Sequence, residues 1–447
     1  MIEDEQSKEK TVPKHHMKIS WFDTIKNASN QVTEASLEEK SLIIGRIGIM
    51  LLSCGTGAWR VREAMNAMAR MLNLTCSADI GLVSISFTCF DRDQICTQVL
   101  KIAQSGVNTS KLDDIERFVR NFADSSSKMN LTEIHLKLDQ IEKKNCSYSI
   151  NILSLAAGLA CSSFIFLLGG GIIEMICCFV GATIGNWIRN QLINRGLTLI
   201  VTIALGVATA CLTYLLVVLG LEKLFHLPPT HEAGYIGSML FVIPGFPFIT
   251  SMLDFSKQDF RSGIERLFYS LMITTVATIV GWLVAYSVHL QPTNFSPLHV
   301  TPLLHMVFRF IASFCGVFGF SIMFNSPYRI ASLTGLIGAF ANTLRLELID
   351  FTKIPPAAIA FFASLTAGIL ASLMNRFDGY PRISLTVPAT VIMIPGLYIY
   401  RGMYKFGSNN ISEGAFWFSK AILIIILIPL GLFMARVIMD RSWRCGE

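Results

Sequence analysis

The residues best placed to do chemistry in this 447-residue chain are two proline–glycine pairs inside long apolar segments. Residues 241–246 read Phe-Val-Ile-Pro-Gly-Phe, and residues 392–397, 151 positions later, read Ile-Met-Ile-Pro-Gly-Leu. Proline removes a backbone donor and glycine loosens a helix, and unwound backbone at membrane depth needs protein or a water-filled cavity around it. Two ordinary proline kinks are the alternative. The repeated pair predicts a small-molecule site at the bilayer midplane, lined by Pro244, Gly245, Phe246, Pro395, Gly396 and Tyr398.

Two asparagines occupy similar positions in the two halves of the chain. Asn186 follows Phe-Val-Gly-Ala at 179–182, and Asn342 follows Leu-Ile-Gly-Ala at 336–339. An amide side chain both donates and accepts hydrogen bonds, so each could hold a substrate's amino or hydroxyl group. Each could equally join two helices, and the sequence leaves both interpretations open.

Ionisable residues at membrane depth are costly and are therefore candidates for function. Glu174 follows three glycines at 169–171 and could carry a proton, or it could be hydrated at the membrane interface. Arg309 lies seven or eight residues inside its apolar segment, where it could pair with Glu174 or extend its side chain to the nearer face.

A charged connection follows the first proline–glycine pair. Asp254 and Arg266 border the lipid region at its two ends and are candidates for gating, substrate release or, for Asp254, proton coupling. The residues between them favour a salt-bridge cluster at a helix end. His226, His231 and Glu232 have no helical ligand spacing, so we expect no metal and no cofactor.

The elements that must position these residues are membrane helices. The chain is 52% hydrophobic and 15% charged, and after residue 147 it is a succession of apolar runs of about 20 residues, enough to cross a bilayer. We predict ten segments. Their ranges are 149–168, 170–188, 196–220, 235–253, 267–290, 301–324, 330–345, 355–374, 385–404 and 415–437. The proline–glycine pairs fall in the fourth and the ninth, which predicts two five-segment units, 148–290 and 291–447, of opposite orientation.

Charge patterning predicts the orientation. With the N-terminus in the cytoplasm, that face carries eleven Lys and Arg residues in its loops against six on the other, including Arg345 and Arg401. The first 40 residues are polar and contain no signal peptide. We expect both termini in the cytoplasm. The net charge of +6 is too dispersed for nucleic acid, and the 11 cysteines, none in a C-x-x-C pair, are expected to be reduced.

Residues 41–147 predict a small cytosolic α+β domain behind a polar extension at 1–40. Val61, Met65, Met68, Ala69 and Leu72 recur at helical spacing, residues 81–90 alternate as a strand, and a second strand runs to 102. Helices are expected near 111–123 and 130–144. No nucleophile elbow or phosphate loop is present, so we expect no enzyme.

These residues resemble the threonine/serine exporter family. The likeness covers nearly the whole chain and includes residues 51–58 (Leu-Leu-Ser-Cys-Gly-Thr-Gly-Ala), the Pro-Gly-Phe-Pro run at 244–247 that leads to Asp254 and Arg266, and the second pair at Pro395. The resemblance implies a cytosolic N-terminal domain, ten membrane segments, and export of threonine and serine driven by the proton motive force. Related bacterial systems split the two halves between subunits and are implicated in succinate export.

We therefore expect a mainly α, multi-pass protein of the bacterial inner membrane, an inverted five-plus-five repeat working by alternating access. Its partners would be a small amino acid, the lipid bilayer and, as an open question, a second copy of the chain. A C4-dicarboxylate exporter and a passive small-solute channel are the alternatives.

Overall fold

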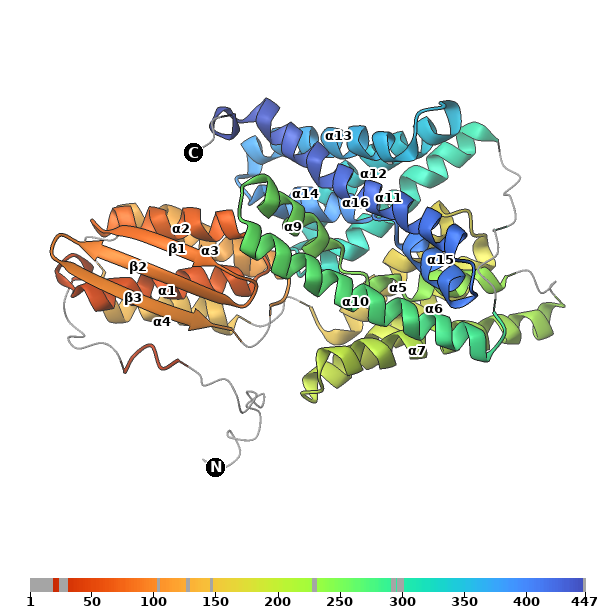
Figure 1. Cartoon of the computed structure of the whole chain (residues 1–447), viewed down its shortest axis with the longest axis horizontal. Helices are drawn as coiled ribbons and strands as arrows, with labels where there is room; N and C mark the ends of the chain where they lie inside the picture. The colour runs from red at the N-terminus through yellow and green to blue at the C-terminus, as the bar shows by residue number, and fades with distance from the viewer. Residues whose placement is uncertain are drawn as a thin grey trace. The chain divides into compact units, whose positions relative to one another are not determined.

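The computed structural model describes residues 19–23, 31–102, 105–125, 129–144, 148–226, 231–290, 295 and 301–444. The chain divides into two compact units, and each is described by itself (Figure 1). The first comprises residues 1–146 together with 254–266, and the second comprises 147–253 and 267–447. Most of the predicted N-terminal extension lies outside the described residues.

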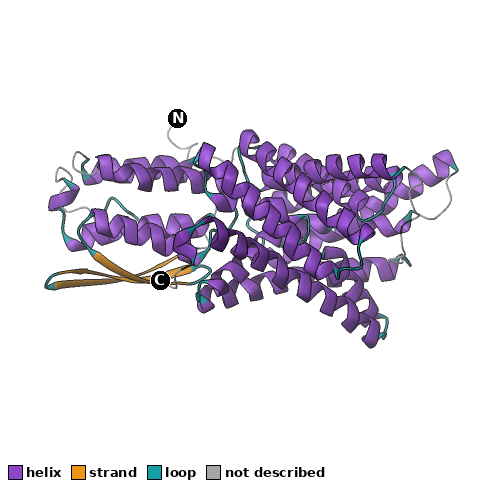
Figure 2. Ribbon diagram, turned by 90° about the horizontal axis from the view of Figure 1, so that it is seen from above, coloured by secondary structure: helices purple, strands orange, loops and turns teal. Residues whose placement is uncertain are grey.

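The first unit is a three-stranded sheet covered on one face by helices (Figure 2). Its strands pair antiparallel in the order β1-β2-β3, with helices α1 and α2 packed against the sheet and α3 and α4 behind them. The elements are α1 (Leu37–Ser53), α2 (Ala58–Met71), β1 (Thr75–Ile80), β2 (Ser84–Asp91), β3 (Gln94–Lys101), α3 (Thr109–Ser125) and α4 (Leu131–Lys143).

Local sequence accounts for most of these elements. A capping box between Ser36 and Glu39 starts α1. Helix α2 buries the apolar face predicted for it, with Val61, Met65 and Met68 inaccessible to solvent. The sequence predicted two strands, but β1 is a third. It escaped notice because its outward residues are polar and two of its three inward residues, Cys76 and Ala78, are small, so its alternation is weak.

A buried arginine joins the first and last helices of this unit. The Arg46 side chain is fully buried and donates hydrogen bonds to the His135 carbonyl (3.1 Å) and to His135 Nδ1 (3.0 Å). It also forms ion pairs with Asp139 and with Glu142 (2.9 Å), and it lies against the ring of Trp21. A buried charge with several hydrogen-bond partners fixes the relative position of α1 and α4.

The second unit is helical throughout its described residues. Its elements are α5 (Ile150–Leu167), α6 (Ile172–Asn194), α7 (Leu199–Phe225), α8 (Tyr235–Ser238), α9 (Gly245–Ser256), α10 (Phe260–Ser287), α11 (Pro302–Met323), α12 (Tyr328–Phe351), α13 (Pro356–Asp378), α14 (Arg382–Val391), α15 (Gly396–Gly407) and α16 (Ile411–Met439). Helices α9 and α10 also supply the residues 254–266 that belong to the first unit. Helix α5 packs on α6 and α11, and α11 packs on α12.

Seven helices in the described part of the chain are long and apolar enough to cross a membrane. They are α5, α6, α7, α10, α11, α13 and α16, and the count rises to nine if α8–α9 and α14–α15 are each one bent span. Helix α12 corresponds to the seventh predicted segment but does not reach that apolar level, since Arg345, Glu347 and Asp350 lie near its end. The protein is thus multi-pass, and the count of ten spans stays a prediction.

The first unit should lose stability in acid through His135. Burial, assisted by the charge of Arg46, lowers the pKa of His135 to about 4, below its ordinary value of about 6.5. The unfolded chain then binds a proton more readily than the folded unit, so stability is full above about pH 6.5 and falls as the pH drops toward about 4. The loss should approach about 3 kcal/mol.

Urea unfolding of the first unit in the detergent-solubilised chain, followed by limited proteolysis, measures this effect at about pH 7.5 and about pH 5. His135→Gln should flatten the pH dependence, whereas the exposed His226→Gln should leave it intact. Equal pH dependence in the His135 variant would contradict the assignment.

Candidate functional site

Both proline–glycine pairs interrupt a helix. The axis bends by 52° between residues 235–242 and α9, and by 47° between α14 and α15. At each break the glycine N–H donates to the carbonyl two residues earlier, Gly245 to Ile243 and Gly396 to Ile394, both at 2.8 Å. The pairs therefore produce the same unwound backbone, as the sequence predicted, and each partly satisfies its freed groups locally.

The two breaks pack against each other through their glycines. A Cβ added at Gly245 would lie 2.7 Å from Ile394 Cδ1 and 3.0 Å from Val391, and a Cβ added at Gly396 would lie 2.8 Å from Ile243 Cδ1 and 2.9 Å from Leu240. The contacts are reciprocal, because Ile243 and Ile394 are 151 residues apart, as the glycines are. A side chain at either glycine would require these apolar atoms of the opposite segment to move.

A cavity of about 550 Å³ lies at the second break. Pro395, Gly396 and Tyr398 line it, together with residues of α5, α11, α12 and α16. That this cavity binds a substrate stays a prediction. Three arginines also line it, namely Arg309, Arg345 and Arg401, together with His305 and one carboxylate, Asp350. A volume of this size accommodates a small polar metabolite.

Arg345 is held in this cavity by neutral oxygens. Its Nε donates to Asn342 Oδ1 at 3.0 Å, and a terminal nitrogen donates to the Met393 carbonyl, next to the break, at 3.4 Å. Asn342 is fully buried and donates in turn to the Ser313 hydroxyl at 2.8 Å. The relay from Ser313 to Asn342 to Arg345 thus positions a guanidinium whose charge these contacts do not neutralise.

The other two arginines are differently placed. Arg309 forms ion pairs with Glu347 (2.9 Å) and Asp350 (2.6 Å) of α12. Arg401 lies over the ring of Trp417, 5.1 Å from its centroid, and Tyr398 contacts the same ring. The lining therefore carries three guanidinium groups and one carboxylate, Asp350, and the second partner of Arg309, Glu347, brings another carboxylate close to the cavity. This arrangement favours an anionic group in the cavity.

Pro244, Gly245 and Phe246 of the first break do not line this cavity. Gly245 lines only a gap of about 10 Å³ that it shares with Gly396, and Phe246 is buried against Phe324, with ring centroids 5.4 Å apart. The structure brings the two breaks together but does not put Pro244, Gly245 or Phe246 on the large cavity. A direct substrate contact by these three residues stays a prediction.

The two asparagines make equivalent contacts. Asn186 donates to the Leu153 carbonyl at 3.2 Å, joining α6 to α5, just as Asn342 joins α12 to α11. Neither lines the large cavity. These are the interhelical contacts of the second interpretation, and Asn342 is connected to the cavity only through Arg345.

Glu174 is buried rather than hydrated. It accepts from the Gly171 N–H (2.9 Å) and contacts His231 Nδ1 (2.8 Å), and the Tyr214 hydroxyl donates to the His231 carbonyl. The proposed pairing of Glu174 with Arg309 is therefore wrong, because Arg309 has its own partners on α12. The described residues include no cluster suited to a metal, and the Glu232 side chain lies outside them.

Asp254 and Arg266 form a buried pair inside the first unit. One Asp254 oxygen accepts from the Ala58 N–H at the start of α2 (2.9 Å), and the other accepts from Ser262 and lies 3.3 Å from Arg266 Nε. Arg266 donates to the carbonyls of Gly55 and Thr56. The pair therefore closes the turn between α1 and α2.

Sequence reasoning missed Arg345, Arg401, His231 and His305. Arg345 and Arg401 were counted only as positive charges of the face opposite the cytoplasm, although they fall inside the predicted segments 330–345 and 385–404. Their positions three residues after Asn342 and five after Gly396 were the available signal. His231 was considered only as a metal ligand. Its pairing with Glu174 joins residues 57 positions apart, which no local pattern predicts.

A helical chain with several membrane-length helices, two broken helices and a charged cavity at one break is a multi-pass membrane transporter. Family comparison then gives its family. A threonine/serine exporter model matches residues 42–289, and a second, described as "Threonine/Serine exporter, ThrE", matches residues 309–438. The chain belongs to the threonine/serine exporter family, a family of transporters and not of enzymes.

Individual relatives are distant. The chain is 24% identical to the "Threonine/serine exporter" of Corynebacterium glutamicum, over 81% of this chain and 74% of that protein. It is 21% identical to the "Probable threonine/serine exporter" of Mycobacterium tuberculosis, over 90% of this chain and 77% of that protein. It is 25% identical to the "Probable succinate transporter subunit YjjP" of Escherichia coli, over 54% of this chain and 91% of that protein. No solved structure matches the chain.

The close packing around Gly245 and Gly396 predicts that a larger side chain at either position lowers stability. Gly245→Val and Gly396→Val should each destabilise the second unit by about 1–3 kcal/mol, because the added side chain meets well-packed isoleucine and leucine atoms. Gly220→Val is the matched control, since a Cβ there has no atom within 4 Å. Thermal unfolding in detergent measures the difference, and midpoints equal to the control would exclude close packing of the breaks.

Proposed function

We propose that this protein exports threonine, serine and similar small polar amino acids, with the substrate carboxylate bound in the arginine-lined cavity at Pro395-Gly396. The single observation that carries the proposal is the excess of guanidinium groups in a cavity that opens onto broken helix backbone. Arginine binds carboxylates through two parallel hydrogen bonds, and Arg345 is oriented for this role by Asn342.

The unwound backbone supplies the remaining polar groups. Residues 392–394 line the cavity, and backbone carbonyls of this unwound segment could accept from an amino or hydroxyl group, while the start of α15 at Gly396 favours negative charge. Tyr398 adds a hydroxyl within the same lining. A small hydroxy amino acid would use all three kinds of contact.

Alternating access is supported by the repeat of 151 residues. The same offset relates the two breaks, their backbone hydrogen bonds and their reciprocal glycine contacts. We propose that the two halves are inverted repeats of five segments, with both termini cytoplasmic, and that they rock about this contact. Close glycine packing suits such motion, since it leaves few interlocking side chains to separate.

Glu174 is the better candidate for the coupling proton. It is buried, it accepts from the Gly171 N–H and it contacts His231 Nδ1 at 2.8 Å, and a buried carboxylate in a membrane helix is a candidate for function. Asp254 accepts from a backbone N–H and a serine and pairs with Arg266, contacts that join it to the turn between α1 and α2. We propose Glu174 for coupling and a gating or anchoring role for Asp254 and Arg266.

A second candidate cargo is a C4-dicarboxylate such as succinate. The observation in its favour is that the lining offers three guanidinium groups but no carboxylate other than Asp350 to receive a substrate ammonium group. The likeness of the first half to a protein described as a succinate transporter subunit points the same way.

The test is counterflow in proteoliposomes with threonine, serine and succinate, with and without a pH gradient. Threonine or serine exchange that responds to the gradient supports the proposal. Flux of succinate alone would identify the substrate as a dicarboxylate. Flux that does not respond to the pH gradient would indicate a passive channel. An absence of flux for all three acids would remove the transport assignment of this cavity.

Arg345→Met should raise the KM for the transported acid roughly 10- to 100-fold, because a charge-assisted hydrogen bond contributes about 1.5–3 kcal/mol. Arg345→Lys should raise the KM less than Arg345→Met does, because lysine keeps the positive charge but lacks the planar pair of donors that arginine offers to a carboxylate. The exposed Arg195→Met serves as control. Unchanged transport in the Arg345→Met variant would show that the carboxylate binds elsewhere.

Glu174→Gln should uncouple transport from the pH gradient while counterflow persists, because the variant cannot release a proton. Glu413→Gln changes a half-exposed carboxylate of α16 and should remain coupled. Asp254→Asn tests the competing carrier. Coupling that survives in the Glu174 variant and disappears in the Asp254 variant would transfer the role to Asp254.

A further inference from the structure

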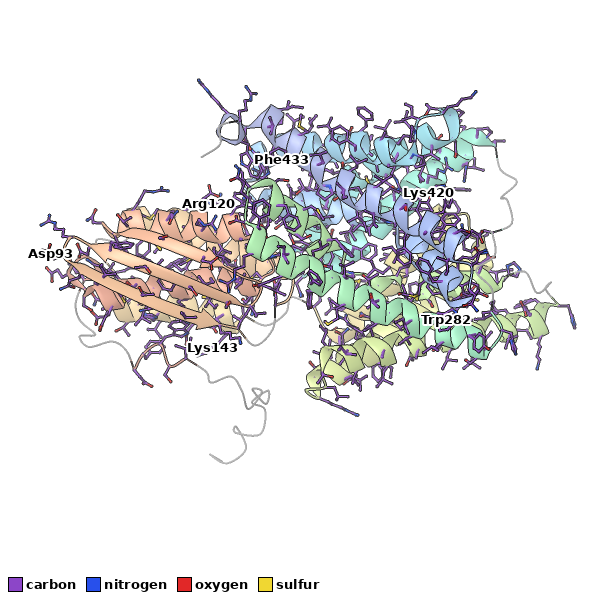
Figure 3. The ribbon with its side chains drawn as sticks, viewed as in Figure 1. Asp93, Arg120, Lys143, Trp282, Lys420 and Phe433 are labelled. Atoms are coloured by element: carbon purple, nitrogen blue, oxygen red, sulfur yellow. The ribbon has the colours of Figure 1, made fainter. Side chains whose placement is uncertain are left out.

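Three cysteines lie in one row across the sheet of the first unit. The strand register places Cys76 opposite Cys89, and Cys89 opposite Cys96. Directly opposed residues of antiparallel neighbours project from the same face, so the three thiols lie side by side. The row is close to the β2–β3 turn that carries Asp93 (Figure 3). Cys89 is buried, and Cys76 and Cys96 are half-buried.

This register suits a disulfide bond. Opposed Cα atoms in antiparallel sheets are about 4.5–5.5 Å apart, within the range of about 4.4–6.8 Å that a disulfide spans. The three cysteines are free thiols in the structure. A bond between neighbours in the row would therefore need little movement of the backbone.

Cys76 and Cys89 are the better pair. A hydrogen bond from Cys76 lowers the pKa of the Cys89 thiol to about 7, although burial acts in the opposite direction. The thiolate is the reactive form of cysteine. Cys96 is engaged differently, since its sulfur accepts a hydrogen bond from Gln98 Nε2 at 3.6 Å. Cys54, by contrast, has its pKa raised to about 12 by burial and has no opposed thiol.

We propose that Cys76 and Cys89 form a reversible modification site that hydrogen peroxide converts to a disulfide. One thiolate attacks the O–O bond and becomes a sulfenic acid, and the released hydroxide takes a proton to form water. The second thiol then displaces the sulfenic hydroxyl as a second water while the S–S bond forms. Both sulfurs are oxidised by one electron each and the peroxide is reduced to two waters. The bond ties edge strand β1 to the central strand β2.

Digestion with trypsin distinguishes a Cys76–Cys89 bond from a bond to Cys96. Residues 71–92 contain Cys76 and Cys89 and no internal lysine or arginine, and Cys96 lies on the next peptide, 93–101. The full-length protein in detergent is treated with hydrogen peroxide, blocked with N-ethylmaleimide and digested without reductant. We expect the mass of peptide 71–92 to fall by two hydrogens and its maleimide labelling to fall at least about fivefold. Dithiothreitol should restore the labelling.

Four cysteine-to-serine variants test which thiols form the bond. Cys76→Ser and Cys89→Ser should each abolish the closed peptide, and Cys96→Ser and Cys54→Ser should keep it, with size-exclusion profiles checking that all four fold. A cross-link between peptides 71–92 and 93–101 would overturn the pairing in favour of Cys96. Full maleimide labelling of peptide 71–92 at peroxide concentrations that oxidise free glutathione would overturn the site itself.

Discussion

The close approach of two unwound helix segments is the constraint on which the second unit depends. Each break frees backbone groups that lipid cannot satisfy, so each must be enclosed by protein. Gly245 and Gly396 allow the segments to enclose one another, because neither has a side chain to separate them. Helices α5, α11 and α12 then surround this contact, and the cavity lies where their packing leaves the second break uncovered.

Charge distinguishes the two halves more than backbone shape does. The breaks share their bends and their hydrogen bonds, but the cavity lies at the second one, together with three arginines. At the first break, Phe246 is buried and packs on Phe324. Two similarly bent segments therefore differ in the side chains around them, and the arginine-lined cavity lies at the second.

The sequence predicted the breaks well because proline and glycine act locally, on the helix that contains them. It also predicted the apolar face of α2, since helical spacing reports burial directly. It could not place Arg345 or pair Glu174 with His231, because these contacts depend on which helices meet. Strand β1 was missed for a related reason: two of its three inward residues are small, and only its pairing with β2 makes it a strand.

The chain enters the first unit twice. Besides residues up to 146, that unit includes 254–266, whose side chains bind the N–H groups of Ala58 and Leu82 and the carbonyls of Gly55 and Thr56. During synthesis these groups stay without their partners until about a hundred further residues, most of them apolar, have been made and inserted. The first unit therefore completes its folding only after the first membrane helices exist, and any division of this chain into two polypeptides has to fall beyond residue 266.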